Sequence, residues 1–224
     1  FVSANSINIA RLLAQVTYYA KSSSEYWQQT GETAGFIVPT GNLGNAFAAL
    51  WAKRIGFPIG TVVLATNANR AVPDYFSTGD YRPQPTTATL ANAMDVGDPS
   101  NMERLTWLYP KVDELRRDVT AISISDAEIT GAIRTSFADT NGGEIWCPHT
   151  ATAVVAREKL GGSNWVLVAT AHPAKFETIV EPLIGRKVEV PAALAVLLER
   201  EAKFVEIEPT LVAFTKYESS LPLR

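Results

Sequence analysis

The chain has 224 residues, 46% of them hydrophobic and 19% charged, which is enough apolar material for a sizeable core and excludes intrinsic disorder. The net charge of −3, without a basic run, argues against nucleic acid as a partner, and no apolar run reaches the ~18 to 20 residues that cross a membrane. The single cysteine, Cys147, excludes an internal disulfide and favours a reducing, cytoplasmic location.

The first half of the chain predicts a βαβ unit. A helix capped by Ser6 has apolar residues at helical spacing from Ile9 to Tyr19, and the run 21–24 ends it. A buried strand follows at 36–38, then a helix at 46–55, then a continuous apolar strand at 61–66. Strand, helix and strand at this spacing indicate a parallel sheet covered on both faces, so we expect an α/β fold with three layers, αβα.

The second half predicts mainly helices after a long irregular segment, 67–99, which is rich in proline. Ser100 and Glu103 match a capping box at the start of the next helix. We expect helices over 100–109, 111–121, 125–138, 149–160, 174–184, 191–201 and 209–219, with a third apolar strand at 165–169 and a short one at 144–147. No domain linker is visible.

The segment Phe36-Ile-Val-Pro-Thr-Gly-Asn-Leu-Gly-Asn45 is the most informative part of the chain. A strand, a glycine-rich turn and a helix can bind phosphate, because the N–H groups of the turn and the positive end of the helix dipole attract an anion. Gly41 and Gly44 would let the backbone approach that anion. The spacing matches neither the dinucleotide nor the Walker pattern, so an ordinary strand-to-helix turn is the alternative.

Polar residues follow three of the predicted strands: Thr40-Gly41-Asn42, Thr66 to Asn69, and Thr170-Ala171-His172. Parallel sheets bind ligands beyond the carboxyl ends of their strands. These three ends are therefore expected to line one crevice, and the alternative is that the polar residues only mark loops.

Other candidate residues have structural explanations beside the functional ones. Cys147 and His149 lack the further ligands of a zinc site, and they form either a Cys–His nucleophilic pair or a packed, structural cysteine. Thr150 is a possible helix-cap hydroxyl. Arg104 either holds a substrate phosphate or is a solvated arginine on a helix.

Taken together, the chain resembles the threonine synthase family. Five blocks in the family's order carry the resemblance: Ser3-Ala-Asn-Ser-Ile-Asn-Ile-Ala-Arg11; Val38-Pro-Thr-Gly-Asn-Leu-Gly-Asn45; Ala65-Thr-Asn-Ala-Asn69 with Thr78-Gly-Asp-Tyr81; Ala93-Met-Asp95 with Pro99-Ser-Asn-Met-Glu-Arg104; and Pro148-His-Thr-Ala151 with Ala169-Thr-Ala-His-Pro-Ala-Lys-Phe176.

The resemblance implies the pyridoxal-phosphate (PLP) fold of the tryptophan synthase β type and the conversion of O-phosphohomoserine and water to threonine and phosphate. It also implies a set of cofactor-binding residues. Thr150 would give its hydroxyl to the pyridine nitrogen, a neutral partner that does not enforce a protonated ring. The phosphate would be held by backbone N–H groups of the loop Gly41, Asn42, Leu43, Gly44 and Asn45.

Two features depart from the family pattern. Leu43 stands where the family usually has phenylalanine, which is tolerable if the backbone binds the phosphate. The family's Schiff-base lysine lies in an N-terminal Ser-Phe-Lys motif that this sequence lacks, and Lys175 belongs to a different block. We therefore expect residues 1–224 to be the C-terminal, PLP-binding large domain of a longer enzyme, without a catalytic residue of its own and with the missing N-terminal half as its partner.

Two other function classes remain as alternatives. The first is a non-catalytic homologue that binds a phosphate ligand. The second is a nucleotide-dependent oxidoreductase, which ranks last because Thr66 and Asn67 stand where an acidic residue would follow the second strand.

Overall fold

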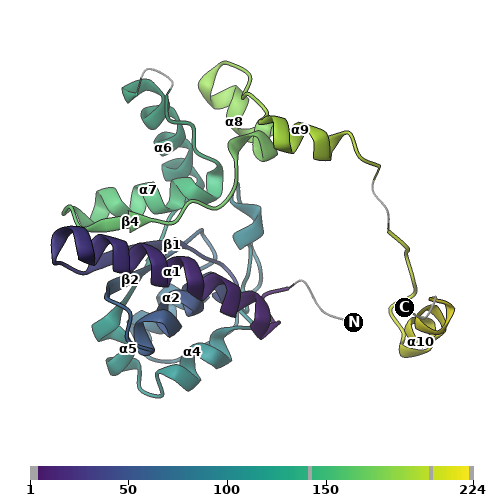
Figure 1. Ribbon diagram of the computed structural model, residues 1–224, viewed down its shortest axis with the longest axis horizontal. Helices are drawn as coiled ribbons and strands as arrows, with labels where there is room; N and C mark the ends of the chain where they lie inside the picture. The colour runs from purple at the N-terminus through teal and green to yellow at the C-terminus, as the bar shows by residue number, and fades with distance from the viewer. Residues whose placement is uncertain (1–4, 141–142, 202–203, 222–224) are drawn as a thin grey trace. The chain divides into compact units, whose positions relative to one another are not determined.

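The computed structural model describes residues 5–140, 143–201 and 204–221. The chain divides into two compact units, Phe1–Val188 and Glu189–Arg224. The first unit holds the sheet and every candidate site residue (Figure 1).

A four-stranded sheet forms the centre of the first unit. Its strands are β1 (Ala34–Pro39), β2 (Ile59–Thr66), β3 (Val119–Ser123) and β4 (Trp165–Leu167). Their order is β3-β2-β1-β4, and every neighbouring pair is parallel. β1 is buried along its whole length, as its uninterrupted apolar sequence predicts.

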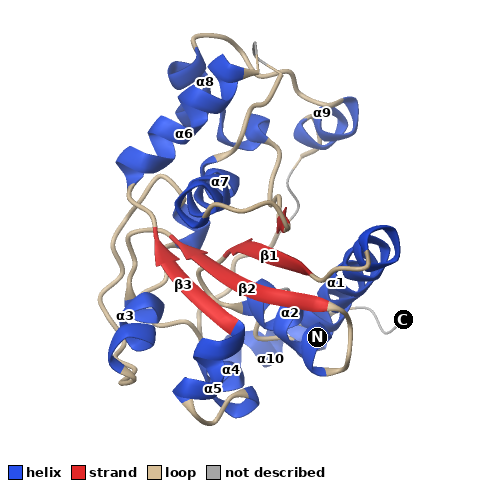
Figure 2. Cartoon of the chain, turned by 90° about the vertical axis from the view of Figure 1, so that its left-hand side faces the viewer, coloured by secondary structure: helices blue, strands red, loops and turns tan. Residues whose placement is uncertain are grey.

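Helices cover both faces of this sheet (Figure 2). On one face, α1 (Ile9–Thr30) packs on α2 (Gly44–Arg54), and both contact the sheet. On the other face, α7 (Pro148–Leu160) lies against β1, β2 and β4, and α6 (Asp126–Asp139) packs on α7. The predicted three-layer αβα arrangement is confirmed.

The edge strand β3 is a correction to the sequence reading. We expected one helix over 111–121, but α5 (Val112–Asp118) ends at Asp118, and the next five residues pair with β2. The β-branched residues of β3, Val119, Thr120 and Ile122, favour the extended backbone. The strand predicted at 144–147 is wrong, because these residues form an irregular segment before α7.

The bounds of α1 also differ from the prediction. Asn8, not Ser6, caps the helix, with its side chain accepting from the N–H of Ala10. The helix continues through 21–24 to Thr30, because the hydroxyls of Ser22 and Ser23 bond back to carbonyl oxygens of the preceding turn, those of Tyr18 and Ala20. Gly31, in the left-handed conformation, ends it.

The segment 67–99 is more ordered than its composition suggests. It contains α3 (Ala71–Thr78) and the short 3-10 helix η1 (Asn92–Met94). Pro73 is tolerated in the first turn of α3, where a backbone N–H has no helical partner. The capping box expected at Ser100 and Glu103 is absent from α4 (Met102–Leu108), whose N-cap is Asn101.

The remaining helices lie at the predicted positions along the chain, with bounds that differ by a few residues. The predicted helix 174–184 is η2 (Pro173–Phe176) followed by α8 (Glu177–Ile184). The second unit contains α9 (Ala192–Leu198) and α10 (Leu211–Ser220), neither of which has a buried residue. No helix in the described part of the chain is long and apolar enough to cross a membrane.

Candidate functional site

A pocket of about 540 Å³ lies beyond the carboxyl ends of β1 and β4. Its walls come from α1, the turn after β1, η1, the start of α7 and the segment after β4. The residues that line it are Ser6, Arg11, Gln15, Tyr18, Pro39, Thr40, Gly41, Asn42, Leu43, Gly44, Asn45, Ala93, Met94, His149, Val168, Ala169 and Thr170. All five residues of the predicted phosphate loop are among them.

The loop presents unpaired backbone donors to this pocket. Leu43 caps α2 in the left-handed conformation, with φ 60° and no side-chain hydrogen bond. The N–H groups of residues 41–45 donate to no acceptor within the described part of the chain. Free N–H groups at a helix start form an anion-binding concavity.

The two glycines of the loop have a different role from the one that their sequence suggested. A Cβ on Gly41 would lie 2.6 Å from the Met94 Cα, and one on Gly44 would lie 2.6 Å from the Ser6 Cβ. Two other segments therefore fill the space that the glycines leave. The glycines allow η1 and the segment before α1 to pack directly on the loop.

A polar network braces the loop from behind. The Asn42 side chain donates to Ser6 Oγ at 2.9 Å and accepts from the Ser100 N–H at 2.6 Å, while Asn101 Nδ2 donates to the Asn42 carbonyl at 2.7 Å. Ser100 thus binds the loop instead of capping α4. We refer to Ser6, Asn42, Ser100 and Asn101 as the brace.

Arg104 extends the brace, so it is not the solvated helix arginine that was the structural alternative. Its guanidinium donates to the carbonyl oxygens of Ser6, at 3.0 Å, and Ile7. It also donates to Asn101 Oδ1. Arg104 therefore holds the segment before α1 in place, rather than standing free in solvent.

The helix α1 contributes a polar stripe that the sequence analysis missed. Arg11, Gln15 and Tyr18, spaced four and three residues apart, line the pocket from one face of the helix. The hydroxyls of Tyr18 and Tyr19 donate to Asn45 Oδ1 at 2.5 and 2.6 Å, which leaves the Asn45 amide nitrogen as the free end of that side chain. Gln15 Oε1 is buried with no hydrogen-bond partner among the described residues.

On the opposite wall, Thr150 lies in a buried cluster with Cys147 and Thr170. Thr150 Oγ accepts from the Thr170 N–H at 3.1 Å and lies 3.1 Å from Thr170 Oγ and 3.3 Å from Cys147 Sγ. Thr170 lines the pocket, and Thr150 stands directly behind it with 3% of its surface exposed. We call Cys147, Thr150 and Thr170 the hydroxyl–thiol cluster.

Cys147 serves as the cap of α7, as a structural cysteine would. Sγ of Cys147 caps α7 by accepting from the Thr150 N–H at 3.4 Å. His149 Nε2 accepts from the Ala93 N–H at 3.0 Å, and its buried Nδ1 has no partner within the described residues. Burial raises the pKa of the Cys147 thiol, but its interactions with His149, Thr150 and Thr170 outweigh burial and lower the pKa to about 6.

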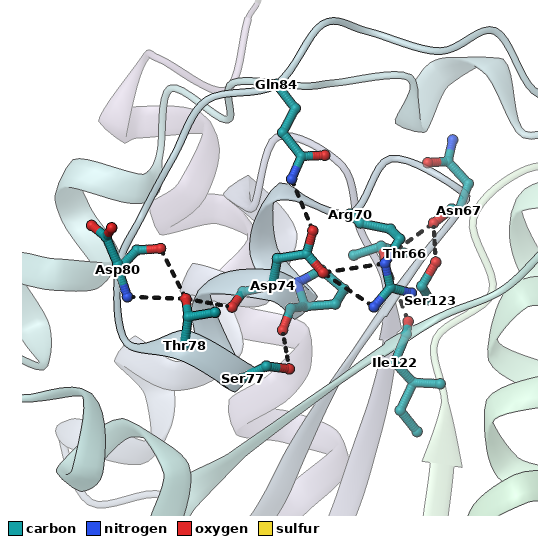
Figure 3. A network of polar contacts seen from close by, with 11 residues as sticks. Thr66, Asn67, Arg70, Asp74, Ser77, Thr78, Asp80, Gln84, Ile122 and Ser123 are labelled. Atoms are coloured by element: carbon teal, nitrogen blue, oxygen red, sulfur yellow. Dashed lines mark hydrogen bonds and ion pairs between the residues drawn. The ribbon is translucent and has the colours of Figure 1, made fainter.

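The carboxyl end of β2 does not join the other two strand ends at the pocket. Thr66 Oγ bonds to main-chain carbonyls, and Ser123 Oγ donates to the Asn67 carbonyl at 2.9 Å (Figure 3). The Asn67 side chain donates to Asp95 Oδ1 at 2.7 Å, and Asp95 accepts from the hydroxyl of Thr89. This end therefore fixes the segment that carries Ala93 and Met94, and the predicted crevice forms from two strand ends rather than three.

Comparison with known proteins shows which proteins this chain resembles. The model of the C-terminal region of threonine synthase matches residues 149–217. The threonine synthase of Serratia marcescens is 39% identical over 199 residues, which are 88% of this chain and 46% of that protein. That of Escherichia coli is 37% identical over 195 residues.

Solved structures of threonine synthases are also similar to this chain. The crystal structure of threonine synthase from Escherichia coli has a TM-score of 0.81 at 33% identity, covering 97% of this chain and 50% of that one. The structure of PLP-bound threonine synthase from Brucella melitensis has a TM-score of 0.83 at 28% identity, over 96% and 52%. The chain spans about half the length of the relatives it matches, and over that half it is similar in sequence and structure to threonine synthases.

Proposed function

We propose that the protein to which this chain belongs is a PLP-dependent threonine synthase, converting O-phospho-L-homoserine and water to L-threonine and phosphate. One observation carries the proposal: in a chain similar to threonine synthases, five consecutive residues, 41–45, line a pocket at the start of α2, and their N–H groups have no acceptor in the described part of the chain. Such a cradle suits the phosphate of the cofactor.

In this proposal, the loop from Gly41 to Asn45 binds the cofactor phosphate through its backbone. Leu43, in the left-handed conformation, is the cap residue of α2, and the Asn45 amide nitrogen is available as a further donor. Because the backbone binds the anion, leucine in place of the family's phenylalanine costs nothing at the phosphate. When bound, PLP supplies an electron sink for carbanion chemistry at the substrate.

Thr150 is the proposed partner of the pyridine nitrogen. Its oxygen already accepts from the Thr170 N–H, so the hydroxyl proton remains to be donated. As a neutral donor, Thr150 would orient the ring without fixing a charge on it.

The catalytic lysine is proposed to come from the part of the protein that this chain does not span. Within residues 1–224 no lysine stands in a Ser-Phe-Lys context. Lys175, on η2, is exposed and not among the residues that line the pocket. The substrate would then bind between this chain's pocket and the remaining half of the protein.

The experiment is release of phosphate from O-phosphohomoserine by the whole protein, with and without added PLP. Turnover that requires PLP supports the proposal, and its absence in a protein that binds PLP contradicts it. Replacing Thr150 by alanine removes one hydrogen bond to the ring, worth ~1.5–3 kcal/mol, so turnover should fall about 10- to 100-fold.

Thr150→Ser keeps the hydroxyl and is the matched control, expected to stay within about threefold of wild type. If Thr150→Ala mainly expels the cofactor instead of slowing turnover, the proposed role at the ring is wrong.

The alternative, a non-catalytic homologue that binds a phosphate ligand, follows from the missing lysine motif. Borohydride reduction of the PLP-loaded whole protein separates the two, because only the enzyme would give a stable lysine adduct.

A further inference from the structure

Two adjacent tyrosines of α1 share one acceptor at the end of the phosphate loop. The hydroxyl of Tyr18 donates to Asn45 Oδ1 at 2.5 Å, and that of Tyr19 donates to the same oxygen at 2.6 Å. An amide oxygen has two lone pairs, so the two hydroxyls fill both. Tyr18 and Asn45 line the pocket, and Tyr19 lies behind them.

The shared oxygen determines which way the Asn45 amide faces. An amide nitrogen cannot accept from a hydroxyl, so a reversed amide would take this acceptor away from both tyrosine protons. With Oδ1 held by the tyrosines, Nδ2 is the end of the side chain that remains for a ligand. It donates to no group within the described part of the chain.

The packing of the two tyrosines keeps this orientation fixed. Tyr19 is fully buried, and its ring meets Phe36 of β1 edge-on, with 5.3 Å between the ring centroids. The ring of Tyr18 packs on that of Tyr19 at 4.6 Å. Burial raises the pKa of both hydroxyls above the usual 10.0, so both keep the protons that they donate at neutral pH.

We propose that Tyr18 and Tyr19 are positioning residues that lock the Asn45 amide with its nitrogen toward the phosphate of bound PLP. The inference rests on the proposed function, in which the loop 41–45 binds that phosphate. The tyrosines act through Asn45, and we refer to these three side chains as the tyrosine lock.

The lock has a consequence for the charge of the bound phosphate. The N–H groups of 41–45 and a locked Nδ2 are all donors, and the acceptor of Asn45 is turned away from them. Donors favour the more negative form of a phosphate monoester, whose second pKa is about 6 in water. A released amide could instead turn Oδ1 to the phosphate and accept from its protonated form. The tyrosine lock therefore selects the dianion.

The test is a double-mutant cycle on the PLP affinity of the whole protein, measured by spectroscopic titration. Tyr18→Phe combined with Tyr19→Phe removes both hydroxyls and keeps both rings, and affinity should fall about 2- to 10-fold. Asn45→Ala removes the donor itself, and affinity should fall about 10- to 100-fold, as for a hydrogen bond to a charged group. In the Asn45→Ala background the two tyrosine substitutions should change affinity less than about twofold, because they act only through Asn45.

Asn45→Asp is a second variant that separates the lock from packing. A carboxylate oxygen accepts from both tyrosines as the amide oxygen does, but the other oxygen then places an acceptor where the nitrogen was. PLP affinity should fall below that of Asn45→Ala. The ³¹P signal of bound PLP gives an independent readout: at pH 6 the wild-type phosphate should remain dianionic, whereas the variant with both tyrosines replaced should show partial protonation.

Tyr109→Phe is the matched control, because Tyr109 is also buried and its hydroxyl bonds to Asp118 at 3.1 Å, away from the residues that line the pocket. Its PLP affinity and ³¹P titration should match those of the wild type. The lock would be overturned by an equal loss of affinity from the two tyrosine substitutions with and without Asn45. A wild-type ³¹P titration in the variant with both tyrosines replaced would overturn it as well. Failure of the wild-type protein to bind PLP would instead overturn the proposed function.

Discussion

The two walls of the pocket are built on different principles. The loop wall, residues 41–45, presents backbone N–H groups, and the side chains behind it only hold it in shape. The wall formed by the hydroxyl–thiol cluster presents the side chain of Thr170, and Thr150 and Cys147 are buried behind it. Substitutions at the loop wall should therefore act through packing, whereas substitutions at the cluster should change the chemistry and leave the fold intact.

The largest effect should come from crowding the loop wall. In Gly44→Ala the new Cβ would lie 2.6 Å from the Ser6 Cβ, so the segment before α1 must shift. Overpacking of this kind costs about 1–3 kcal/mol, and with the loop displaced we expect PLP affinity to fall at least about tenfold. Spectroscopic titration of the whole protein with PLP measures it.

Gly131→Ala is the matched control, because this helical glycine in α6 has no atom within 4 Å of the added methyl. Stability there should rise by up to ~1 kcal/mol, since alanine is the better helix former. Equal PLP affinities for Gly44→Ala and wild type would mean that the loop does not bind the phosphate.

A smaller loss of stability and PLP affinity should follow from removing one side chain of the brace, that of Asn101. Asn101 is fully buried, and its amide donates to the Asn42 carbonyl and Ser6 Oγ. Asn101→Ala removes the donor of the Asn42 carbonyl, whereas Ser6 Oγ keeps its bond from Asn42 Nδ2, and the cost should be about 1–3 kcal/mol in unfolding free energy. Denaturant unfolding gives the loss, and PLP affinity should fall with it.

Thr106→Ala, on the same helix, removes a hydroxyl that bonds only to α4's own carbonyls and should stay within ~0.5 kcal/mol of wild type. If Asn101→Ala lost no more stability than this control, the loop would be held by other contacts.

The loop and Thr150 could be predicted from the sequence, whereas the brace that holds the loop could not. The loop was visible because strand, glycine turn and helix are local features, and the resemblance brought Thr150 to attention. The brace was not visible, because Asn42 and Asn101 are 59 residues apart and pair only in the fold. Ser100 had the spacing of a capping residue, but its tertiary bond to Asn42 outcompeted the local one.

Predictions of helix ends from residue type also failed where side-chain hydroxyls bonded to main-chain carbonyls within a helix. The serines at 22 and 23 signalled a helix end but bond back into α1. β3 follows α5 with no intervening turn, so a charged helical pattern continued into it. A capping box forms instead at Ser125 and Glu128, where the Ser125 side chain bonds to Glu128 and makes no tertiary hydrogen bond among the described residues.

The smallest effect should come from the contact between α6 and α7, the helix whose first residues form the wall of the hydroxyl–thiol cluster. Glu128, in the first turn of α6, pairs with Lys159 near the end of α7 at 2.6 Å. The bonds from Lys159 and Ser125 lower the pKa of Glu128 from 4.5 to about 2. A lowered folded-state pKa adds stability above pH 4.5, and this contribution is lost as the pH falls through 2.

Glu128→Gln should therefore lower the unfolding free energy at pH 7 by less than ~1 kcal/mol, because both side chains are more than a third exposed. Denaturant unfolding at pH 7 and pH 2.5 measures the difference, which should shrink at the lower pH. Glu114→Gln, whose exposed partner Lys111 lies 4.0 Å away, serves as the control with no measurable change. If the difference in unfolding free energy between Glu128→Gln and wild type were the same at pH 2.5 as at pH 7, the carboxylate would act through packing rather than through its charge.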